Sequence, residues 1–343
     1  MKTALIGLGR IGWSYHRPQI LAHKGFEFTA VVDTSQERLD EAKALYGVEG
    51  YTDHKEMLAK AKPELVIIAS PTLFHEAHAI DSMEAGAHVL LDKPMTIDYE
   101  SALRIAEAQK RSGKKLVIYQ PRRFNSVVQT AKAIIESGKL GQIFQMRTNR
   151  TGYSRRDDWQ AFRKNGGGML CNYGAHHIDE LIYLAKSDAK DFFCRIRKIL
   201  SMGDAEDVAH ILIKTENGIL LDVDINQADA LGTDGMQLYG ANGSAVLTAD
   251  ETGEYFLVKY CDPTKFEEKT ASTEMAVAGR KYPSDKIQWI TEKYMLKDFP
   301  PVDFYAECEK YFMEDGPSPV PLQETLRIME LIDLGYKQNP VIE

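Results

Sequence analysis

Three glycines near the amino terminus constrain the fold of this chain more than any other feature. They lie in the segment GLGRIG, directly after the apolar run of residues 3–6 and before a segment of helical periodicity. In a strand–loop–helix context, such glycines permit a tight turn, close approach of a phosphate to the backbone, and close helix–strand packing. The loop also places a phosphate at the positive end of a helix. We therefore predict a binding loop for the pyrophosphate of a dinucleotide, formed by Gly7, Gly9, Arg10, Ile11 and Gly12.

The second apolar run ends in Asp33, about 20 residues beyond the last glycine of the loop. A carboxylate at this position accepts hydrogen bonds from the ribose hydroxyls of NAD and repels the 2′-phosphate of NADP. NAD is therefore the expected cofactor. Thr34 and Arg38 are close enough to accommodate a phosphate if Asp33 turns away, which leaves NADP possible.

Residues 1–120 alternate short apolar runs with amphipathic helical segments. The runs are near-continuous, as expected for strands covered by helices on both faces of a sheet. Asp53 with Glu56 forms a capping-box pattern, while Asp98 and Gly113 mark the start and end of another helix. We predict an α/β Rossmann domain with a doubly wound parallel sheet. Its predicted strands are residues 3–6, 28–32, 65–69, 88–91 and 116–119.

After residue 120 the pattern changes, because strand-like runs follow one another without helices between them. This favours a large, mostly antiparallel open sheet in an α+β domain over residues 121–343. Asn242-Gly243 predicts a tight hairpin turn. Residues 265–298 are too irregular to assign. The predicted strands are residues 142–150, 192–200, 209–214, 219–225, 236–239 and 245–248, and the predicted helices are residues 127–137, 304–313 and 323–338.

Composition excludes several classes of function. The formal net charge of -8 provides no electrostatic footprint for nucleic acid or anionic lipid. No stretch approaches the roughly 20 apolar residues that span a bilayer, and the first apolar run breaks at Gly7 before a signal peptide is complete. The four cysteines lack the spacing of disulfide frameworks or metal sites, so we expect a cytoplasmic protein. His75 and His78 are one residue too close for a zinc-binding helix face, so no metal is expected.

Several later segments carry a family resemblance. The sequence reads Asp92-Lys93-Pro94 after the fourth predicted strand, and a glycine run at residues 166–168 leads into Asn172 and His176. Together with the dinucleotide loop, the turn at residues 71–75, the segment at residues 122–124 and the closing helix, these motifs occur in one order along nearly the whole chain. In this respect the chain resembles the Gfo/Idh/MocA family, which includes glucose-fructose oxidoreductase and inositol dehydrogenases.

The resemblance implies roles for individual residues. The matching lysine, Lys93, would lie near the nicotinamide and the reacting hydroxyl, where its charge would stabilise a developing alkoxide. The matching histidine, His176, would transfer the proton, because histidine titrates near the working pH. Position 172 normally carries aspartate in this family, so Asn172 is a departure, and we expect it to orient the histidine without sharing its proton. The residues expected at the cofactor after the glycine loop and Asp33 are Ser70, Pro71, Thr72, His75, Asp92 and Lys93.

Some of these assignments have a structural alternative. Thr72 could contact the cofactor or cap the following helix. Asp179 follows His176 by three residues on a predicted helix, where it could face the histidine or serve in capping or packing. One arginine of the pair Arg122-Arg123 could tie the two domains together instead of binding substrate. Cys171 is expected to be a small packing residue, and His177 a packing or surface residue.

The substrate is expected in the cleft between the domains. Tyr153 and Trp159 belong to a polar and aromatic segment that suits a polyhydroxylated ring, although exposed loops often have the same composition. The full set of predicted substrate residues is Lys93, Arg122, Asn125, Tyr153, Trp159, Asn172 and His176.

These observations predict an NAD(P)-dependent oxidoreductase that transfers a hydride between the nicotinamide and a secondary alcohol of a sugar, cyclitol or polyol. Two alternatives stay open: an NAD-dependent glycosidase of the same family, which oxidises and later re-reduces its substrate, and a dinucleotide-binding sensor without catalysis. The expected partners are a small-molecule sugar or polyol and further copies of the chain, as a homodimer or homotetramer formed through the C-terminal sheet.

Overall fold

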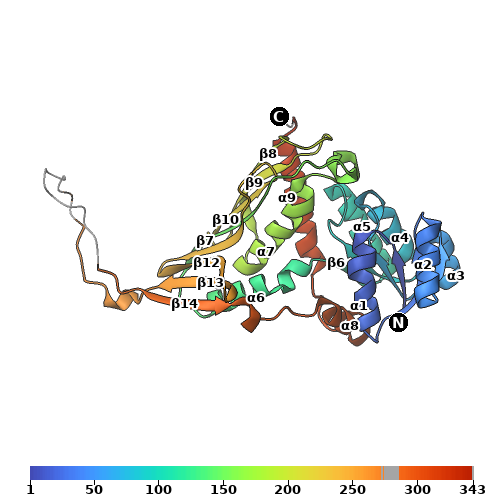
Figure 1. Ribbon diagram of the computed structural model, residues 1–343, viewed down its shortest axis with the longest axis horizontal. Coiled ribbons are helices and arrows are strands. Elements are labelled where there is room, and N and C mark those ends of the chain that lie inside the picture. Colours follow the sequence, from blue (N-terminus) through green and yellow to red (C-terminus); the bar gives the residue numbers. More distant parts are fainter. Residues whose placement is uncertain (272, 274–285, 342–343) are drawn as a thin grey trace.

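The computed structural model describes residues 1–271, 273 and 286–341. Within these ranges, fourteen strands form two sheets with helices packed against each (Figure 1). None of the helices in this part of the chain is both long enough and apolar enough to cross a membrane.

The first sheet has the order β3-β2-β1-β4-β5-β6, and all neighbouring strands are parallel. This is the strand order of a doubly wound Rossmann fold, and it confirms the predicted fold class. The short strand β3 was not predicted, because its sequence EGY has no apolar run. The strands are β1 (Lys2–Ile6), β2 (Glu27–Val32), β3 (Glu49–Tyr51), β4 (Leu65–Ile68), β5 (His88–Asp92) and β6 (Leu116–Tyr119).

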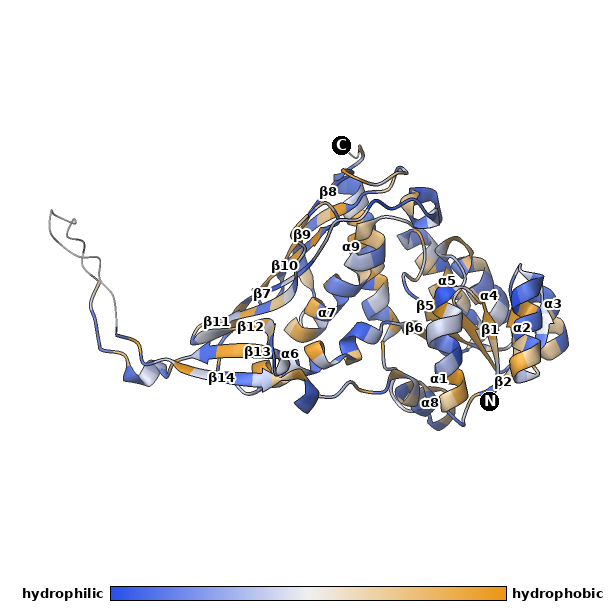
Figure 2. Cartoon of the chain, in the orientation of Figure 1, coloured by the Kyte–Doolittle hydropathy of each residue, from blue (hydrophilic) through white to orange (hydrophobic). Residues whose placement is uncertain are grey.

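Alternate side chains of this parallel sheet enter two different cores. Ala4 and Ile6 of β1 join the core beneath α3, α4 and α5, whereas Leu5 joins the core beneath α1, α2 and α8. Figure 2 shows these strands mainly in hydrophobic colours between helices of mixed colour. The helices are α1 (Arg17–Ala22), α2 (Gln36–Tyr46), α3 (His54–Ala61), α4 (His75–Glu84), α5 (Tyr99–Ser112) and α8 (Phe304–Glu314).

The predicted helix signals act as expected. The side chain of Asp53 accepts a hydrogen bond from the backbone N–H of Glu56 at the start of α3. Asp98 caps α5 in the same way, and Gly113 ends that helix in the left-handed conformation, with φ 66°. Local capping chemistry therefore determines where these helices begin and end.

The second sheet has the order β14-β13-β12-β11-β7-β10-β9-β8, and its pairs are antiparallel except for β7 with β10. This confirms the predicted mostly antiparallel sheet. Strands β13 and β14 were not predicted, and β14 lies in the unassigned region. The strands are β7 (Ile143–Thr151), β8 (Ala189–Arg197), β9 (Val208–Thr215), β10 (Leu220–Asn226), β11 (Asp234–Gly240), β12 (Gly243–Asp250), β13 (Gly253–Tyr260) and β14 (Ile290–Met295).

The predicted hairpin joins β11 to β12, but its turn lies one residue earlier than expected. Gly240 pairs with Gly243, so the two loop residues are Ala241 and Asn242. Gly243 is the first residue of β12, where a Cβ atom would lie 2.3 Å from the carbonyl oxygen of Lys259. Glycine is needed there because a neighbouring strand approaches closely.

Helices α6, α7 and α9 lie along the side of the second sheet that faces the Rossmann half (Figure 1). Helix α9 contacts α5 and β6 on one side and α7 and β8 on the other. One continuous apolar core therefore joins the two halves. Helix α8 packs on the parallel sheet although it lies beyond residue 120, and the domain boundary at that residue stays a prediction. The three helices are α6 (Ser126–Glu136), α7 (Ala175–Ala185) and α9 (Leu322–Gln338).

Candidate active site

The glycine loop follows β1 and has room for a ligand only above Gly9. Gly7 has φ 95°, and a Cβ atom there would lie 2.6 Å from the carbonyl oxygen of Ala69. A Cβ atom on Gly12 would lie 1.9 Å from the carbonyl oxygen of Gly7, whereas one on Gly9 would meet nothing within 4 Å. Gly7 and Gly12 thus hold the loop against the sheet while Gly9 stays open. This cradle fits the pyrophosphate of a dinucleotide.

Asp33 lies beside the loop at the end of β2. Its Oδ2 accepts a hydrogen bond of 2.7 Å from the backbone N–H of Leu8, and its Oδ1 accepts one of 2.9 Å from Ser35. These bonds fix the carboxylate at the edge of the cradle, where adenosine ribose hydroxyls are expected. The exposed guanidinium of Arg38 lies 3.5 Å from the same carboxylate. In the loop itself, Arg10 is exposed and Ile11 half-buried.

The turn after β4 braces the site instead of offering His75 to a cofactor. His75 is buried, with Nε2 2.8 Å from the carbonyl oxygen of Ser70 and Nδ1 3.0 Å from that of Pro94. Because both ring nitrogens face backbone carbonyls, the predicted cofactor contact of His75 is replaced by a link between the β4 and β5 loops. Thr72 is also buried and packs against Gly166, and α4 has no side-chain cap. Ser70 and Pro71 line the carboxyl edge of the sheet as expected.

Lys93 leaves the carboxyl end of β5 and reaches across to the second half of the chain. Its Nζ donates hydrogen bonds of 3.0 Å to the backbone carbonyl and 2.8 Å to the side-chain oxygen of Asn172. Burial lowers the pKa of Lys93 below its ordinary value, against the opposing charge of Asp92. Asn172 lies on the π-helical turn at Leu170–Gly174, which leads directly into α7. Asn172 therefore orients the lysine, and not His176 as the sequence suggested.

Asp92 lies below this lysine and is almost fully buried. Its Oδ1 accepts a 2.8 Å hydrogen bond from the backbone N–H of Lys93. Burial raises the pKa of Asp92 to about 6, although the charge of Lys93 opposes this shift. Because the carboxyl is enclosed, its contribution to the cofactor site is to support the Lys93 backbone.

His176 is half-buried in the first turn of α7. Its Nδ1 is enclosed without a hydrogen-bond partner among the described residues, so Nε2 is the nitrogen that remains for a ligand. Burial, followed by the charges of Lys93 and Arg122, lowers its pKa well below the ordinary value. The imidazole is therefore neutral near neutral pH and can accept a proton at Nε2.

Glu180 is a site residue that sequence reasoning missed. It is fully buried on α7, where Oε2 accepts a 2.9 Å hydrogen bond from Arg122 Nε and Oε1 lies 2.7 Å from His177 Nδ1. Burial raises the pKa of Glu180, but the neighbouring Arg122 and His177 outweigh it and hold this pKa at about 2. The spacing from His177 to Glu180 was visible in the sequence, yet nothing there indicated a buried acid. His177 was expected to be a packing or a surface residue. It is buried, which agrees with the packing role.

The two adjacent arginines have different partners. Arg123 is buried and donates two 2.6 Å hydrogen bonds to Asp179, and it also pairs with Glu324 of α9. Arg123 is therefore the arginine that ties helices together, and Asp179 serves that pair and not His176. The side chain of Arg122 is 31% exposed and stays available to the site.

Three predicted substrate residues remain: Asn125 caps a helix, and Tyr153 and Trp159 lie on an exposed segment. Asn125 is the N-cap of α6, and its side-chain oxygen accepts a hydrogen bond from Val128. This capping role accounts for Asn125 without a substrate. Tyr153 and Trp159 are 63% and 40% exposed. The short helical turn that follows Trp159, at Arg163–Asn165, contacts the turn at Thr72–Phe74, so this segment borders the carboxyl edge of the parallel sheet.

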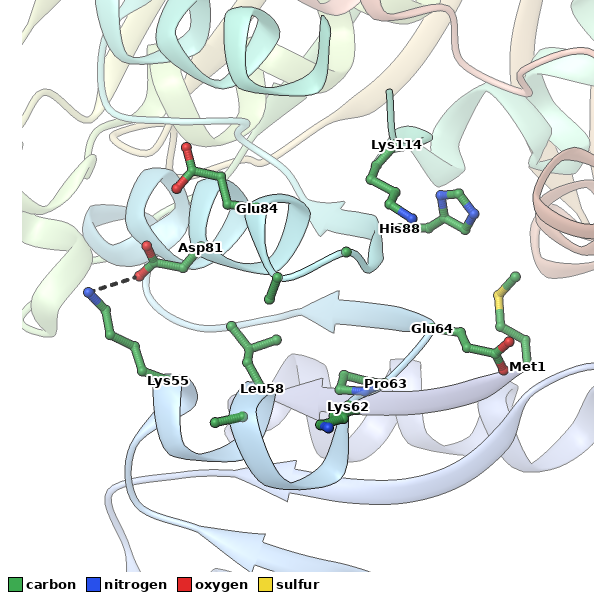
Figure 3. Close-up of a pocket in the computed structure, with 13 residues that line it drawn as sticks. Met1, Lys55, Leu58, Lys62, Pro63, Glu64, Asp81, Glu84, His88 and Lys114 are labelled. Atoms are coloured by element: carbon green, nitrogen blue, oxygen red, sulfur yellow. Dashed lines mark ion pairs between the residues drawn. The ribbon is translucent and has the colours of Figure 1, made fainter. Parts of the chain in front are cut away.

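A surface cavity and Cys171 are two further candidate features. The cavity lies away from the carboxyl edge of the parallel sheet, and Cys171 lacks a reactive thiol. A cavity of about 720 Å³ opens at the amino edge of the parallel sheet, where Lys55 lies 3.4 Å from Asp81 (Figure 3). None of the predicted site residues lines it. Cys171 is buried, and burial raises its pKa to about 12, which leaves the thiol unreactive. The described ranges hold no group of three or more His, Cys, Asp or Glu side chains arranged for a metal ion.

Comparison with known proteins identifies the family. Residues 1–120 match the oxidoreductase family with an NAD-binding Rossmann fold, and residues 128–246 match the GFO/IDH/MocA C-terminal domain. The chain belongs to the Gfo/Idh/MocA oxidoreductase family.

Curated relatives align with part of the chain. An uncharacterized oxidoreductase of Schizosaccharomyces pombe is 34% identical over 191 residues, which cover 54% of this chain and 51% of the relative. D-glucoside 3-dehydrogenase of Escherichia coli is 29% identical over 54% of each chain. Inositol 2-dehydrogenase 2 of Saccharopolyspora erythraea is 28% identical over 66% of each. The match to the first two spans about half of their length.

Solved structures show the same fold over nearly the whole Gfo/Idh/MocA chain. An NAD-binding protein from Listeria innocua aligns with a TM-score of 0.82 and 24% identity, covering 99% of this chain and 94% of that one. The WlbA dehydrogenase from Bordetella pertussis, solved with NADH and UDP-GlcNAcA, aligns with a TM-score of 0.77 and 20% identity over 99% and 96%.

Proposed function

We propose that this chain is an NAD-dependent dehydrogenase that oxidises a secondary alcohol of a sugar, cyclitol or polyol, or catalyses the reverse reduction. The observation that carries the proposal is the position of Lys93. It extends from the carboxyl edge of the parallel sheet, where open α/β sheets bind ligands, toward the segment that bears Asn172 and His176. A cation and a neutral histidine beside a dinucleotide cradle suit hydride transfer from a carbinol.

When bound, NAD would accept the hydride from the carbinol carbon of the substrate. Gly7, Gly9, Gly12 and Asp33 would hold the cofactor at its pyrophosphate and adenosine ribose. An ammonium group has three N–H donors, and Asn172 accepts two from Lys93. The third donor is free to orient the reacting hydroxyl and to stabilise negative charge on its oxygen.

The hydroxyl proton would pass to Nε2 of His176. A base must be unprotonated to accept it, and the lowered pKa of His176 keeps the imidazole neutral. In the reverse direction the same nitrogen returns a proton to the new alcohol. Because Nδ1 has no acceptor in the described part of the chain, no carboxylate there stabilises the charged ring. The protonated imidazole of His176 therefore readily releases this proton.

The names of the relatives support the substrate class. One is called a D-glucoside 3-dehydrogenase and another an inositol 2-dehydrogenase, so both names specify ring alcohols. Sequence identity stays below a third for these two relatives.

The direct test is a screen of sugars, cyclitols and polyols for reduction of NAD and, in parallel, of NADP. We expect at least one such alcohol to reduce NAD, with NADP less effective. NAD that binds tightly and promotes glycoside cleavage without net reduction would favour the glycosidase. Binding of NAD with no turnover of any alcohol or glycoside would favour the sensor and contradict the dehydrogenase.

We further propose that copies of this chain associate through the outer face of the second sheet. Helices cover the other face, while the outer face carries large exposed apolar side chains: Phe193, Leu220 and Val246 are 55%, 37% and 36% exposed. A second sheet placed on this face would remove them from water. Light scattering of the purified protein tests for the dimer or tetramer.

A further inference from the structure

Arg122 has a fixed inner nitrogen and an open outer edge. Its Nε donates a 2.9 Å hydrogen bond to Glu180, a fully buried residue. In the described part of the chain, the two terminal nitrogens of Arg122 have no hydrogen-bond partner, and the side chain is partly exposed. Glu180 is itself held by His177. The guanidinium is thus oriented from behind and presents two donors outward.

The open edge of Arg122 belongs to the same site as Lys93. Asp92 pairs with Tyr119 across β5 and β6, so the loops that carry Lys93 and Arg122 leave adjacent strands at the same edge. The charge of Arg122 also lowers the pKa of both Lys93 and His176, which agrees with this shared edge.

Asp92 and Glu180, the acidic residues beside Lys93 and Arg122, already have hydrogen-bond partners. Asp92 is buried beneath Lys93 and bonds to its backbone, and Glu180 is enclosed between Arg122 and His177. The other arginine whose charge acts on Lys93 is Arg156, and both oxygens of Asp158 already accept its hydrogen bonds, at 2.8 and 2.9 Å. The site therefore presents positively charged side chains to a ligand. Among these, Arg122 has a planar guanidinium whose two terminal nitrogens have no hydrogen-bond partner among the described residues.

We propose that Arg122 binds a carboxylate on the substrate, so that the site prefers sugar acids such as uronates or aldonates to the corresponding neutral sugars and polyols. Two parallel N–H donors match the two oxygens of a carboxylate. The carboxylate also compensates the positive charge of Lys93 without competing for its hydroxyl-binding donor. This inference rests on the proposed function, because it assigns the substrate of the same site.

The test measures binding to the NADH complex by calorimetry, which does not depend on turnover. The probes are matched pairs: D-glucuronate with D-glucose, D-galacturonate with D-galactose, and D-gluconate with sorbitol, with glucose 6-phosphate as the other anion. We expect at least one acid to bind at least about tenfold more tightly than its neutral partner. In Arg122→Gln that preference should disappear, and in Arg122→Lys it should be reduced. Arg111→Gln removes an arginine paired with Glu84 on the surface and should preserve the preference.

Thermal unfolding of each variant ensures that a lost preference reflects the site and not the fold. If Arg122→Gln is unfolded, Arg122→Lys decides the question, because it keeps the charge and loses the planar pair of donors. Equal binding of acids and neutral partners would overturn the proposal, as would an acid preference that survives in both variants or tighter binding of the phosphate. Neutral sugars that reduce NAD while acids fail to bind would overturn this inference alone. Arg122-dependent binding of acids with no NAD reduction by any alcohol would instead overturn the proposed dehydrogenase.

Discussion

Lys93 donates two hydrogen bonds to one residue, Asn172, using both its backbone carbonyl and its side-chain oxygen. The two residues come from different halves of the chain, so this contact joins the end of β5 to the turn that precedes α7. A neutral amide fixes the ammonium group without neutralising it. The positive charge therefore remains available for the oxygen of a substrate.

Replacing Lys93 with alanine should impair chemistry far more than cofactor binding. Its charge acts on the developing alkoxide, so we expect turnover to fall by about 10²–10³-fold with little change in the Kd for NAD. Steady-state kinetics and a fluorescence titration with NADH measure the two effects. Lys110→Ala, on the exposed side of α5, is the matched control. Normal turnover in Lys93→Ala would remove this residue from the mechanism.

The adjacent histidines provide an internal comparison. His176→Ala should lower turnover by about 10²–10⁴-fold, because Nε2 of this ring is the proposed proton acceptor. His177→Ala should instead lower the melting temperature, because His177 is buried against Glu180, while the folded fraction keeps its turnover within about tenfold. Initial rates normalised to folded protein separate the two effects. The reverse result would show that the base has been misassigned.

Asn172→Asp should move the acid limb of the pH profile for oxidation to higher pH. The new carboxylate would pair with Lys93 and favour the protonated forms of both Lys93 and His176, so their pKa values would rise. A histidine with a higher pKa becomes neutral, and therefore basic, only at higher pH. The check is kcat against pH for the wild type, Asn172→Asp and Asn172→Ala. An acid limb that is unchanged or shifted downward in Asn172→Asp would contradict the arrangement.

Asp33 should determine the preference for NAD. Asp33→Ser removes the charge that opposes a 2′-phosphate and frees Arg38, which lies 3.5 Å from it, to pair with that phosphate. The ratio of kcat/KM for NAD to that for NADP should fall by about tenfold or more. Asp40→Ser, an exposed position on α2, is the control. A wild-type protein that already prefers NADP would refute this reading of Asp33.

The buried pair of Arg123 and Asp179 should contribute more to stability than an exposed ion pair. Arg123→Gln leaves Asp179 without its partner and should lower the free energy of unfolding by about 3–5 kcal/mol. Arg111→Gln breaks an exposed ion pair and should cost less than about 1 kcal/mol. Urea denaturation followed by circular dichroism compares them. Equal losses in both variants would mean that the buried pair contributes no more than a surface pair.

The fold class and the positions of the motifs follow from local signals along the chain. The glycine loop is decided by sterics among near neighbours, since Gly7 and Gly12 admit no Cβ atom. Eleven of the fourteen described strands follow from the pattern of apolar residues, whereas β3, β13 and β14 were not predicted. Helix ends follow from capping groups within four positions. Strand β3 escaped prediction because a three-residue strand with one buried side chain carries too little of that signal.

Which polar groups contact one another depends on how the chain packs. Asn172 bonds to Lys93 and not to His176, His75 braces two loops, and Arg123 takes the structural role that left Arg122 open. The Lys93–Asn172 contact joins residues 79 positions apart. Apolar burial is non-directional and depends on residue type, so its pattern can be read along the chain. A hydrogen bond requires its two groups within about 3 Å at a suitable angle, and for distant residues only the packed fold determines that distance.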